Sequence, residues 1–348
     1  MSRACYGTLD MSNSLPLLLT GASGVIGTEL LACMPAERLL LSRYRTPIDS
    51  PAQQISLNIR EARLGLDDAA YQALAGGISG ILHCAAITDM NGVADGLHET
   101  NIDGVRHMIA LAEAADVPLH YVSTAYCSKT YGPKQPAASA YVASKRAAEQ
   151  LVRASKVRWT ISRPSIVVGR SDTGAIANFQ GFHLFITSIL KGRLPFFPLD
   201  PEAHCDFVPA DYVASALAGI VAAPTFSETY WLTGGARAIT IRQMMEYGAP
   251  FAAELGRDLS DIPMSDPESF RRDQLPALQA RLPRRLMERI NVLLELSSVM
   301  ATERPFPSDM ARLVPDAAPL DTQTLQKTLG HNLHFWGKAN RHVFQTAP

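Results

Sequence analysis

LLLTGASGVIG, residues 17–27, is the segment from which the fold of this chain can be inferred. An apolar run, Leu15–Leu19, precedes the three glycines Gly21, Gly24 and Gly27, and a helical pattern, Val25–Met34, follows. Glycines at this spacing allow a tight turn, close approach of the backbone to a pyrophosphate and close packing of helix on strand. The helix N-terminus would face the phosphates with its free N–H groups. We expect a dinucleotide site; the alternative is an ordinary strand–helix turn.

Apolar runs and helical patterns alternate after this segment. The runs typical of buried strands are Leu39–Leu41, Ile78–Cys84, Leu119–Ser123 and Trp159–Ser162, and Tyr230–Thr233 adds another. The helical patterns are Asp67–Ala75, Asn101–Asp116, Tyr141–Ser155 and Ala210–Ala223. This alternation is typical of βαβ units, and continuous apolar strands are typical of a sheet covered on both faces. The sequence predicts an α/β fold, a Rossmann doubly wound parallel sheet.

The segments 171–203 and 241–330 lack this alternation of strand and helix patterns. They predict a smaller, mostly helical C-terminal substrate domain. In it, Leu286, Ile290, Leu293, Leu294 and Met300 are spaced for one face of a helix. We expect the Rossmann domain to comprise 14–170 and 204–240, and the substrate-binding part 171–203 and 241–330. Residues 1–13 and 331–348 are expected to be polar tails, the second containing His331 and His334.

Composition excludes several classes of function. The 348 residues are 47% hydrophobic, ample for a large core, and the net charge of −1 gives no electrostatic case for nucleic acid or an anionic membrane. No segment approaches the roughly 20 apolar residues of a membrane span, and no secretory signal is apparent. Five scattered cysteines fit reduced thiols, so a cytoplasmic protein is expected. No metal-ligand motif occurs, and we expect no metal.

Tyr141 and Lys145, in YVASK, are the candidate reaction centre. Four residues apart on a helix, they share one face. A tyrosine pKa is near 10, and both an ammonium and an oxidised nicotinamide would favour the phenolate. Lys145 would also hydrogen-bond the nicotinamide ribose. Thr124 ends an apolar strand, where ligands bind in such sheets, and its hydroxyl would hold a substrate carbonyl; Ser123 is the less favoured alternative.

Arg43 indicates which dinucleotide is bound. An NAD site needs a carboxylate about 20 residues after the first glycine, to bind the ribose 2′-hydroxyl. This chain instead has Ser42-Arg43, with Arg45 close by. Because an arginine fork suits a 2′-phosphate, we expect NADP (NADPH). The alternative is that Arg43 is a solvated loop residue.

The chain resembles the extended short-chain dehydrogenases/reductases, and within them the thioester-reductase and fatty-acyl-CoA-reductase (male-sterility type NAD-binding) branch. The resemblance spans roughly residues 15–235. Beside the glycine segment it rests on RLGLDDAAYQALA, ILHCAAIT, ETNIDGVRHMIALA, YVSTAY, YVASKRAAEQLV, SRPSIVVG and DFVPADYVASAL. The LGL and STAY parts are specific to the branch. The C-terminal third matches poorly, so the resemblance does not indicate the substrate.

The resemblance implies a role for each matching position. The catalytic triad would be Thr124, Tyr141 and Lys145, and Asn101 would organise the site behind the lysine. The diphosphate would lie on Gly21, Ser23, Gly24, Val25 and Ile26. Ala85 and Ala86 would pass beneath the adenosine and ribose, and Pro164, Ser165 and Ile166 would flank the nicotinamide. Where the family has an acidic residue near the adenine, this chain has Leu57-Asn58-Ile59; the Asn58 carbonyl can still accept a hydrogen bond, without the charge.

These observations predict an NADPH-dependent reductase of a carbonyl, with an acyl thioester, CoA- or carrier-bound, as the favoured substrate. The alternatives are an enzyme acting on a free ketone, aldehyde or alcohol, or on a nucleotide sugar, and, last, a non-catalytic NADP-sensing protein. Two clusters of side chains each allow two roles. The phenylalanines Phe179, Phe182, Phe185, Phe196 and Phe197 would line an acyl channel or form core. The arginines Arg271, Arg272, Arg281, Arg284, Arg285 and Arg289 would dock an acidic acyl carrier protein or form a solvated face.

Overall fold

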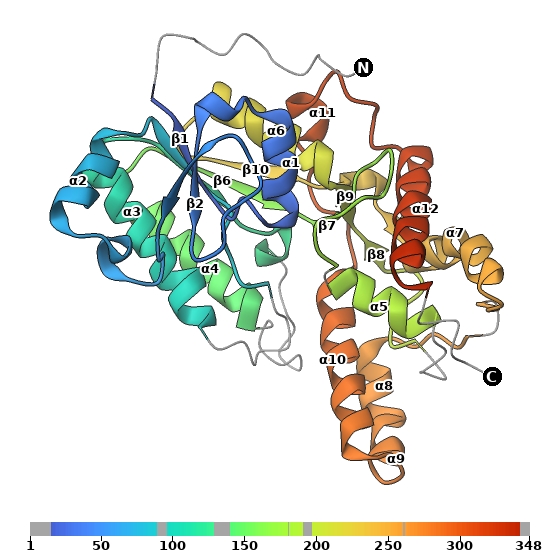
Figure 1. The fold of residues 1–348 in the computed structure, drawn as a ribbon. Helices are drawn as coiled ribbons and strands as arrows, with labels where there is room; N and C mark the ends of the chain where they lie inside the picture. Colours follow the sequence, from blue (N-terminus) through green and yellow to red (C-terminus); the bar gives the residue numbers. More distant parts are fainter. Residues whose placement is uncertain are drawn as a thin grey trace.

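A seven-stranded parallel sheet forms the centre of the molecule (Figure 1). The computed structural model describes residues 15–88, 96–128, 140–179, 181–190, 197–259 and 262–341. The strand order is β10-β6-β5-β4-β1-β2-β3, and every neighbouring pair is parallel. The strands are β1 (Leu17–Thr20), β2 (Leu39–Arg43), β3 (Gln53–Ser56), β4 (Gly80–His83), β5 (Leu119–Val122), β6 (Trp159–Pro164) and β10 (Glu228–Leu232). The predicted doubly wound sheet is confirmed.

Helices cover both faces of this sheet (Figure 1). One face carries α2 (Asp68–Gly76), α3 (Gly104–Ala115) and α4 (Ala140–Ala154); the other carries α1 (Val25–Cys33) and α6 (Ala210–Ala222). The central strands β1, β4 and β5 are buried at every position because successive side chains pack on opposite layers. Leu17 and Leu19 belong to the core on the α1 side, and Leu18 to the core under α2 and α3.

Short helical turns connect several of these elements. They are η1 (Ala36–Arg38), η2 (Ala62–Gly65), the π-helical turn η3 (Glu99–Asp103), η4 (Ala125–Ser128) and η5 (Gly235–Arg237). Local chemistry sets several helix starts. The Asp67 side chain accepts a hydrogen bond from the Ala70 N–H at the start of α2, and Thr240 and Gln243 form a capping box at the start of α7 (Ile241–Glu254).

The remaining helices lie beside the sheet and form the smaller part. They are α5 (Gly181–Leu190), α7, α8 (Pro267–Asp273), α9 (Leu275–Gln279), α10 (Arg284–Met300), α11 (Met310–Leu313) and α12 (Thr322–Ala339). Figure 1 shows α8, α9 and the first half of α10 projecting from the body. Two small sheets join the parts: β7 (Ile166–Val168) with β9 (Phe207–Pro209), and β11 (Ile239–Thr240), β8 (His204–Cys205) and β12 (Ala301–Thr302).

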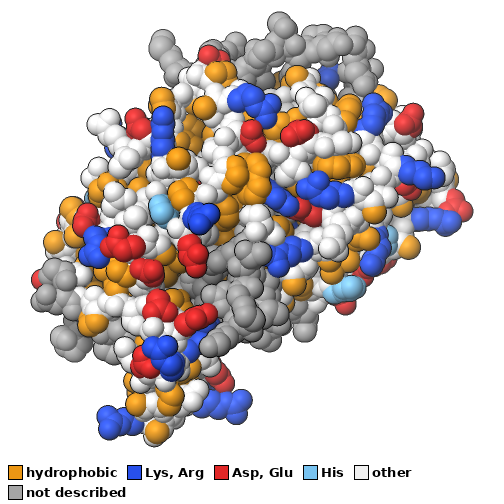
Figure 2. Space-filling model, turned by 180° about the vertical axis from the view of Figure 1, so that it is seen from behind, with side chains coloured by type: hydrophobic (Ala, Val, Ile, Leu, Met, Phe, Trp, Pro, Cys, Tyr) orange, Lys and Arg blue, Asp and Glu red, His pale blue; other side chains and the backbone are white. Residues whose placement is uncertain are grey.

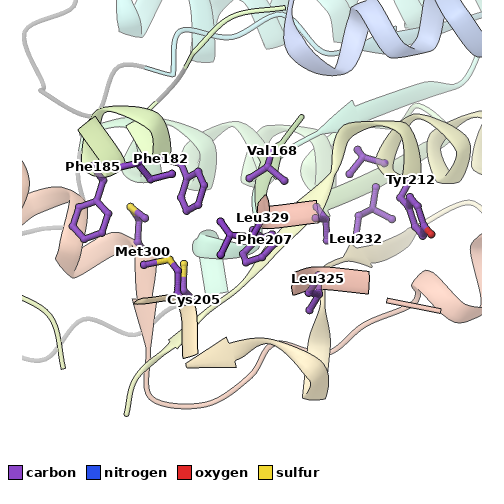
Figure 3. Packing of buried hydrophobic residues seen from close by; sticks show 14 of the residues in the cluster. Val168, Phe182, Phe185, Cys205, Phe207, Tyr212, Leu232, Met300, Leu325 and Leu329 are labelled. Carbon is purple, nitrogen blue, oxygen red and sulfur yellow. The ribbon is translucent and has the colours of Figure 1, made fainter. Parts of the chain in front are cut away.

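One hydrophobic cluster runs through both parts, from Leu17 and Leu19 to Leu325 and Trp336. Figure 3 shows its centre, where Phe182 of α5, Met300 of α10 and Phe207 of β9 pack together. The chain's division into a cofactor part and a substrate part stays a prediction, since these side chains form a continuous core.

The polar tail expected at residues 331–348 is wrong for its first part. Residues 331–339 form the second half of α12, so His331 and His334 lie on a helix instead of in a tail. Leu333 and Trp336 continue the buried face of that helix, while the histidines occupy its exposed face. Residues 1–13 and 342–348 lie outside the described residues. No helix among the described residues has both the length and the apolar character needed to cross a bilayer.

Candidate active site

The turn between β1 and α1 can be built only with glycine at two positions. Gly21 has φ +74°, and a Cβ there would lie 2.7 Å from the backbone nitrogen of Ala85. A Cβ on Gly27 would lie 2.2 Å from the Gly21 carbonyl oxygen. Gly24 is the N-cap residue of α1 and brings no side chain to the N–H groups of the first turn. The turn therefore offers an anion the open end of a helix, as the diphosphate of a dinucleotide requires.

A cavity of about 190 Å³ opens from this turn across the carboxyl ends of the central strands. Gly21, Gly24, Val25 and Ile26 line one end of it, with Ala86 beside them. Thr124, Tyr141 and Lys145 line the next part, and Pro164, Ser165 and Ile166 the wall opposite. The sequence thus identified residues from five separate segments that the fold brings to one cavity.

Lys145 is almost fully buried beneath this cavity, with 3% of its surface exposed. Its Nζ donates to the Val122 carbonyl oxygen at 2.9 Å and lies 4.9 Å from the centre of the Tyr121 ring. Burial lowers the pKa of Lys145 to about 8, while Cys127, Cys84 and Glu149 act in the opposite direction. At neutral pH the side chain is therefore an ammonium, close to its deprotonation.

Tyr141 lies one turn before Lys145 on α4 and is also buried. Burial, with a smaller contribution from the Cys127 thiol, raises the pKa of Tyr141 above that of a free tyrosine. A tyrosine in this state is protonated at every physiological pH. It is therefore suited to donate a proton to a developing alkoxide, which is the role of an acid in reduction.

Thr124 and Ser123 both reach the cavity but make different contacts. The Thr124 hydroxyl donates to the Pro164 carbonyl oxygen at 3.4 Å, across the mouth of the site. The Ser123 hydroxyl lies 3.5 Å from the Cys127 sulfur, toward the protein interior. The assignment of the substrate contact to Thr124 stays a prediction, and this geometry is consistent with it.

Asn101 lies behind the site on the π-helical turn η3 and is 1% exposed. Its Oδ1 accepts from the Ile87 N–H at 2.8 Å, and its Nδ2 donates to the Ile87 carbonyl at 2.9 Å and to the Ser144 hydroxyl at 3.0 Å. The amide thereby ties the segment after β4 to the helix that carries Lys145. Asn101 organises the backbone around the cavity without lining it.

Ala86 is the only residue expected at the adenosine end that lines the described cavity; the others expected there, and Ser23 of the diphosphate turn, lie outside its lining. Arg43 is half-buried at the end of β2, where its guanidinium donates to the Arg45 carbonyl at 3.4 Å. The Asn58 amide donates to Glu61 at 2.6 Å and accepts from the Arg60 N–H at 3.2 Å. Ile59 packs against Gly104. Ser23 is exposed in the turn, and the Ala85 N–H donates to the Thr20 hydroxyl at 3.2 Å. Contact of these residues with a cofactor stays a prediction.

The cavity lining also includes residues that the sequence did not assign firmly to the site. Tyr126 follows the STAY threonine, Phe182 belongs to α5, and Leu296 and Met300 belong to α10. Phe182 was expected in an acyl channel or in the core, Met300 only on an apolar helix face, and Leu296 was not predicted at all. Phe185 and Phe197 pack on each other at 5.8 Å between ring centres and are core. Phe179 is exposed, and Phe196 lies outside the described residues.

The cysteines near the cavity have the character of inert thiols. Burial raises the pKa of Cys84 to about 12 and also raises that of Cys127. Neither thiol is therefore a thiolate at neutral pH, and the thiolate is the form that acts as a nucleophile. Among the described residues, no group of three His, Cys, Asp or Glu side chains is placed to hold a metal ion.

The sheet, the glycine turn and the Tyr141–Lys145 pair define a nicotinamide-dinucleotide-binding protein of the extended short-chain dehydrogenase/reductase type. Residues 35–217, just over half of the chain, match the model of an NAD-binding family described as male sterility protein, and the chain belongs to that family. The match begins after the glycine turn and ends before α7 to α12.

Several curated relatives are large synthases of which this chain matches a small part. Fusarin C synthetase of Gibberella fujikuroi is 24% identical over 268 residues, which are 68% of this chain and 7% of that protein. Isonitrile lipopeptide synthase of Streptomyces coeruleorubidus is 27% identical over 58% of this chain and 16% of its own length. Ceramide reductase of Caulobacter vibrioides is 29% identical over 166 residues, 47% of this chain and 49% of that enzyme.

Solved structures with the same fold include reductase domains. The terminal R domain from the myxalamid PKS-NRPS biosynthetic pathway superposes with a TM-score of 0.71 at 21% identity, covering 93% of this chain and 92% of the other. A thiolation-reductase di-domain from an archaeal non-ribosomal peptide synthetase gives a TM-score of 0.66 at 16% identity, covering 93% and 76%. Because 93% of this chain is covered, the shared fold extends beyond the segment that matches the family model.

Proposed function

We propose that this protein is an NADPH-dependent reductase that converts an acyl thioester into an aldehyde and a free thiol. The observation that carries the proposal is the cavity that joins the glycine turn to Thr124, Tyr141 and Lys145. Membership of the NAD-binding family and similarity to synthases and R domains support it.

A bound reduced nicotinamide supplies the hydride for this reaction. The chain's own residues polarise and protonate the acceptor. The Thr124 hydroxyl orients the thioester carbonyl oxygen, and Tyr141 gives that oxygen its proton as negative charge develops. Lys145 supplies a positive charge beneath the tyrosine. The resulting hemithioacetal loses its thiol and leaves the aldehyde; a second round would give the alcohol.

A thioester fits this site better than the matching acid. Hydride attack on a carboxylate places more negative charge on an anion, and Tyr141 and Thr124 bring no full positive charge to the carbonyl. A thioester is neutral and has a good leaving group. The cavity wall from α5 and α10 is apolar, formed by Phe182, Leu296 and Met300, and suits the acyl portion.

NADPH is proposed over NADH on the position of Arg43 at the end of β2. An acyl carrier protein is proposed as one source of the thioester, docking on the arginines of α8 to α10. The projecting part formed by α8, α9 and the first half of α10 exposes four arginines, Arg272, Arg281, Arg284 and Arg285. Figure 2 shows Lys and Arg side chains at the tip of this part. We propose a cytoplasmic location, since Cys33, Cys84, Cys127 and Cys205 are all free thiols.

The test is an assay with NADPH and a panel of acyl-CoAs and acyl-carrier thioesters, following NADPH absorbance, thiol release and aldehyde formation. We expect consumption with thioesters, stoichiometric thiol and no reaction with the matching acids. Tyr141→Phe is the matched control: it should bind NADPH normally and lose turnover by about 10²–10⁴-fold, because the proton donor is gone. Wild-type turnover in Tyr141→Phe would refute the mechanism.

A second candidate is reduction of a free ketone or aldehyde, since the name ceramide reductase refers to a lipid that carries no thioester. It uses the same cavity and the same three residues. The same assay separates the two: turnover of simple ketones or aldehydes, with none of any thioester, would replace the thioester proposal by this one.

A further inference from the structure

The floor of the site beneath Lys145 is aromatic. Tyr121 lies on β5 with its ring under the ammonium, whose Nζ is 4.9 Å from the ring centre. Tyr121 and Lys145 are 1% and 3% exposed. A cation over an aromatic face is attracted by the ring quadrupole, and the attraction is larger where water is excluded. This pair satisfies both conditions.

The Tyr121 ring is itself held by its neighbours on the sheet. Tyr121 pairs with His83 of β4 in the parallel register, and the two rings stack at 6.0 Å with an angle of 22° between planes. The Thr20 hydroxyl lies 2.7 Å from His83 Nδ1 and fixes the imidazole. Burial, then the Lys145 charge, lowers the pKa of His83 to about 3, so this neighbour stays neutral and does not repel the ammonium.

The Tyr121 hydroxyl is not what holds the ring in place. It is buried, and no hydrogen-bond partner for it exists among the residues that the structure describes. The ring alone therefore carries the contact with Lys145. We propose that Tyr121 is a positioning residue for Lys145: its aromatic face, together with the Val122 carbonyl, keeps the lysine charged and fixed below the cleft.

Other groups around the lysine act on its charge as well. They are the Cys127 thiol on η4, the Cys84 thiol after β4 and the Glu149 carboxylate one turn along α4. Tyr141 lies one turn before Lys145 on the same helix. The carboxylate of Glu149 is neutralised by a two-point ion pair with Arg163, at 2.8 and 2.5 Å. The Val122 carbonyl and the uncharged ring of Tyr121 are direct contacts of Nζ that favour its ammonium form.

The test measures the titration of the Lys145 side chain directly by NMR. The chain has seven lysines, so selective ¹³C labelling of the lysine ε-carbon gives few NMR signals, and loss of one signal in Lys145→Met assigns it. We expect Lys145 to titrate near pH 8 in the wild type. Tyr121→Phe keeps the ring and should titrate at the same pH. Tyr121→Leu and the better-filling Tyr121→Met lack the ring, and their midpoint should fall by roughly half to one pH unit.

A control variant separates this effect from general destabilisation. Tyr71→Leu removes another buried tyrosine from the same core cluster, on α2 and away from the lysine. It should lower stability and leave the Lys145 titration unchanged. Equal midpoints in the wild type and in both ring-less variants, or the same shift in Tyr121→Phe, would overturn the proposal.

The link to turnover rests on the proposed function and is measured separately. In the reductase assay, kcat/KM should decline above the Lys145 midpoint, and this alkaline limb should move to lower pH in Tyr121→Met but not in Tyr121→Phe. If no substrate class is turned over, the proposed function fails while the NMR titration still decides the role of Tyr121. A shifted titration with an unshifted alkaline limb would show that Lys145 does not control turnover.

Discussion

Arg43 is the residue on which the proposed preference for NADPH rests. Its guanidinium lies at the end of β2, where a carboxylate would be needed to bind the 2′-hydroxyl of NAD. We expect Arg43→Ala to weaken NADPH binding by about 10–100-fold, the loss of one or two charge-assisted hydrogen bonds, and to change NADH binding little. Fluorescence titration with both cofactors measures this.

Arg45→Ala is the comparison for that experiment. The Arg45 guanidinium is exposed and lies 4.8 Å from the centre of the Tyr44 ring, so its loss should alter NADPH affinity much less. Equal weakening of NADPH and NADH in Arg43→Ala would remove Arg43 from the recognition of the 2′-phosphate.

Single residues were predictable where backbone geometry or chemistry admits few alternatives. Gly21 and Gly27 lie where a Cβ would collide with the backbone, and Tyr141 and Lys145 share a helix face because of their spacing. Leu296 and Met300 carried no such signal, since an apolar stripe on a helix predicts burial equally well. Their place in the cavity wall depends on how α10 packs against the sheet, which no local pattern specifies.

At the scale of elements, α12 is fastened to the loop after β7 by Asn332. The Asn332 Oδ1 accepts from the Gly169 N–H at 2.6 Å, and its Nδ2 donates to the Thr328 carbonyl at 2.9 Å, with the side chain 1% exposed. Asn332→Ala leaves a buried N–H without this acceptor. We expect it to lower the free energy of unfolding by about 1–3 kcal/mol, measured by urea denaturation.

Lys338→Ala is the control on the same helix. Lys338 is exposed in the last turn of α12, and its substitution should change the free energy of unfolding by less than about 0.5 kcal/mol. A comparable loss in both variants would show that the effect of Asn332→Ala does not come from the contact with Gly169.

The elements that sequence reasoning missed share a physical cause. β3 is an edge strand of sequence QQIS, exposed at both ends, so no apolar run marks it. The strands β8, β11 and β12 have two residues each, too few for any periodic pattern. The second half of α12 looked like a tail because the polar residues of its exposed face outnumber Leu333 and Trp336, which continue the buried one.

At the scale of the whole molecule, buried histidines make stability depend on acid. Burial lowers the pKa of His83 to about 3 and that of His120 and His183 to about 4, against about 6.5 in the unfolded chain. The unfolded chain therefore binds more protons below pH 6.5. The stability these groups contribute is complete above that pH and is lost as the pH falls toward 4, at up to about 1.4 kcal/mol per pH unit for each histidine.

Denaturation at pH 7.5, 6.5 and 5.5 measures this loss. His120→Gln should reduce the slope below pH 6.5 by roughly one proton, and comparison with the wild type cancels the contributions of the other titrating groups. A slope in His120→Gln equal to that of the wild type would show that His120 is not neutral in the folded protein.

The wall of the cavity formed by Leu296 and Met300 has an evolutionary consequence. These residues are contributed by α10, more than a hundred positions beyond Lys145 in the chain and outside the segment that matches the family model. Because α10 is separate in the chain from the glycine turn and from α4, substitutions in it can change the cavity wall without altering the segments that carry Gly21, Tyr141 and Lys145. Two proteins that descend from one ancestor could therefore differ in the substrate they accept and still bind the same cofactor.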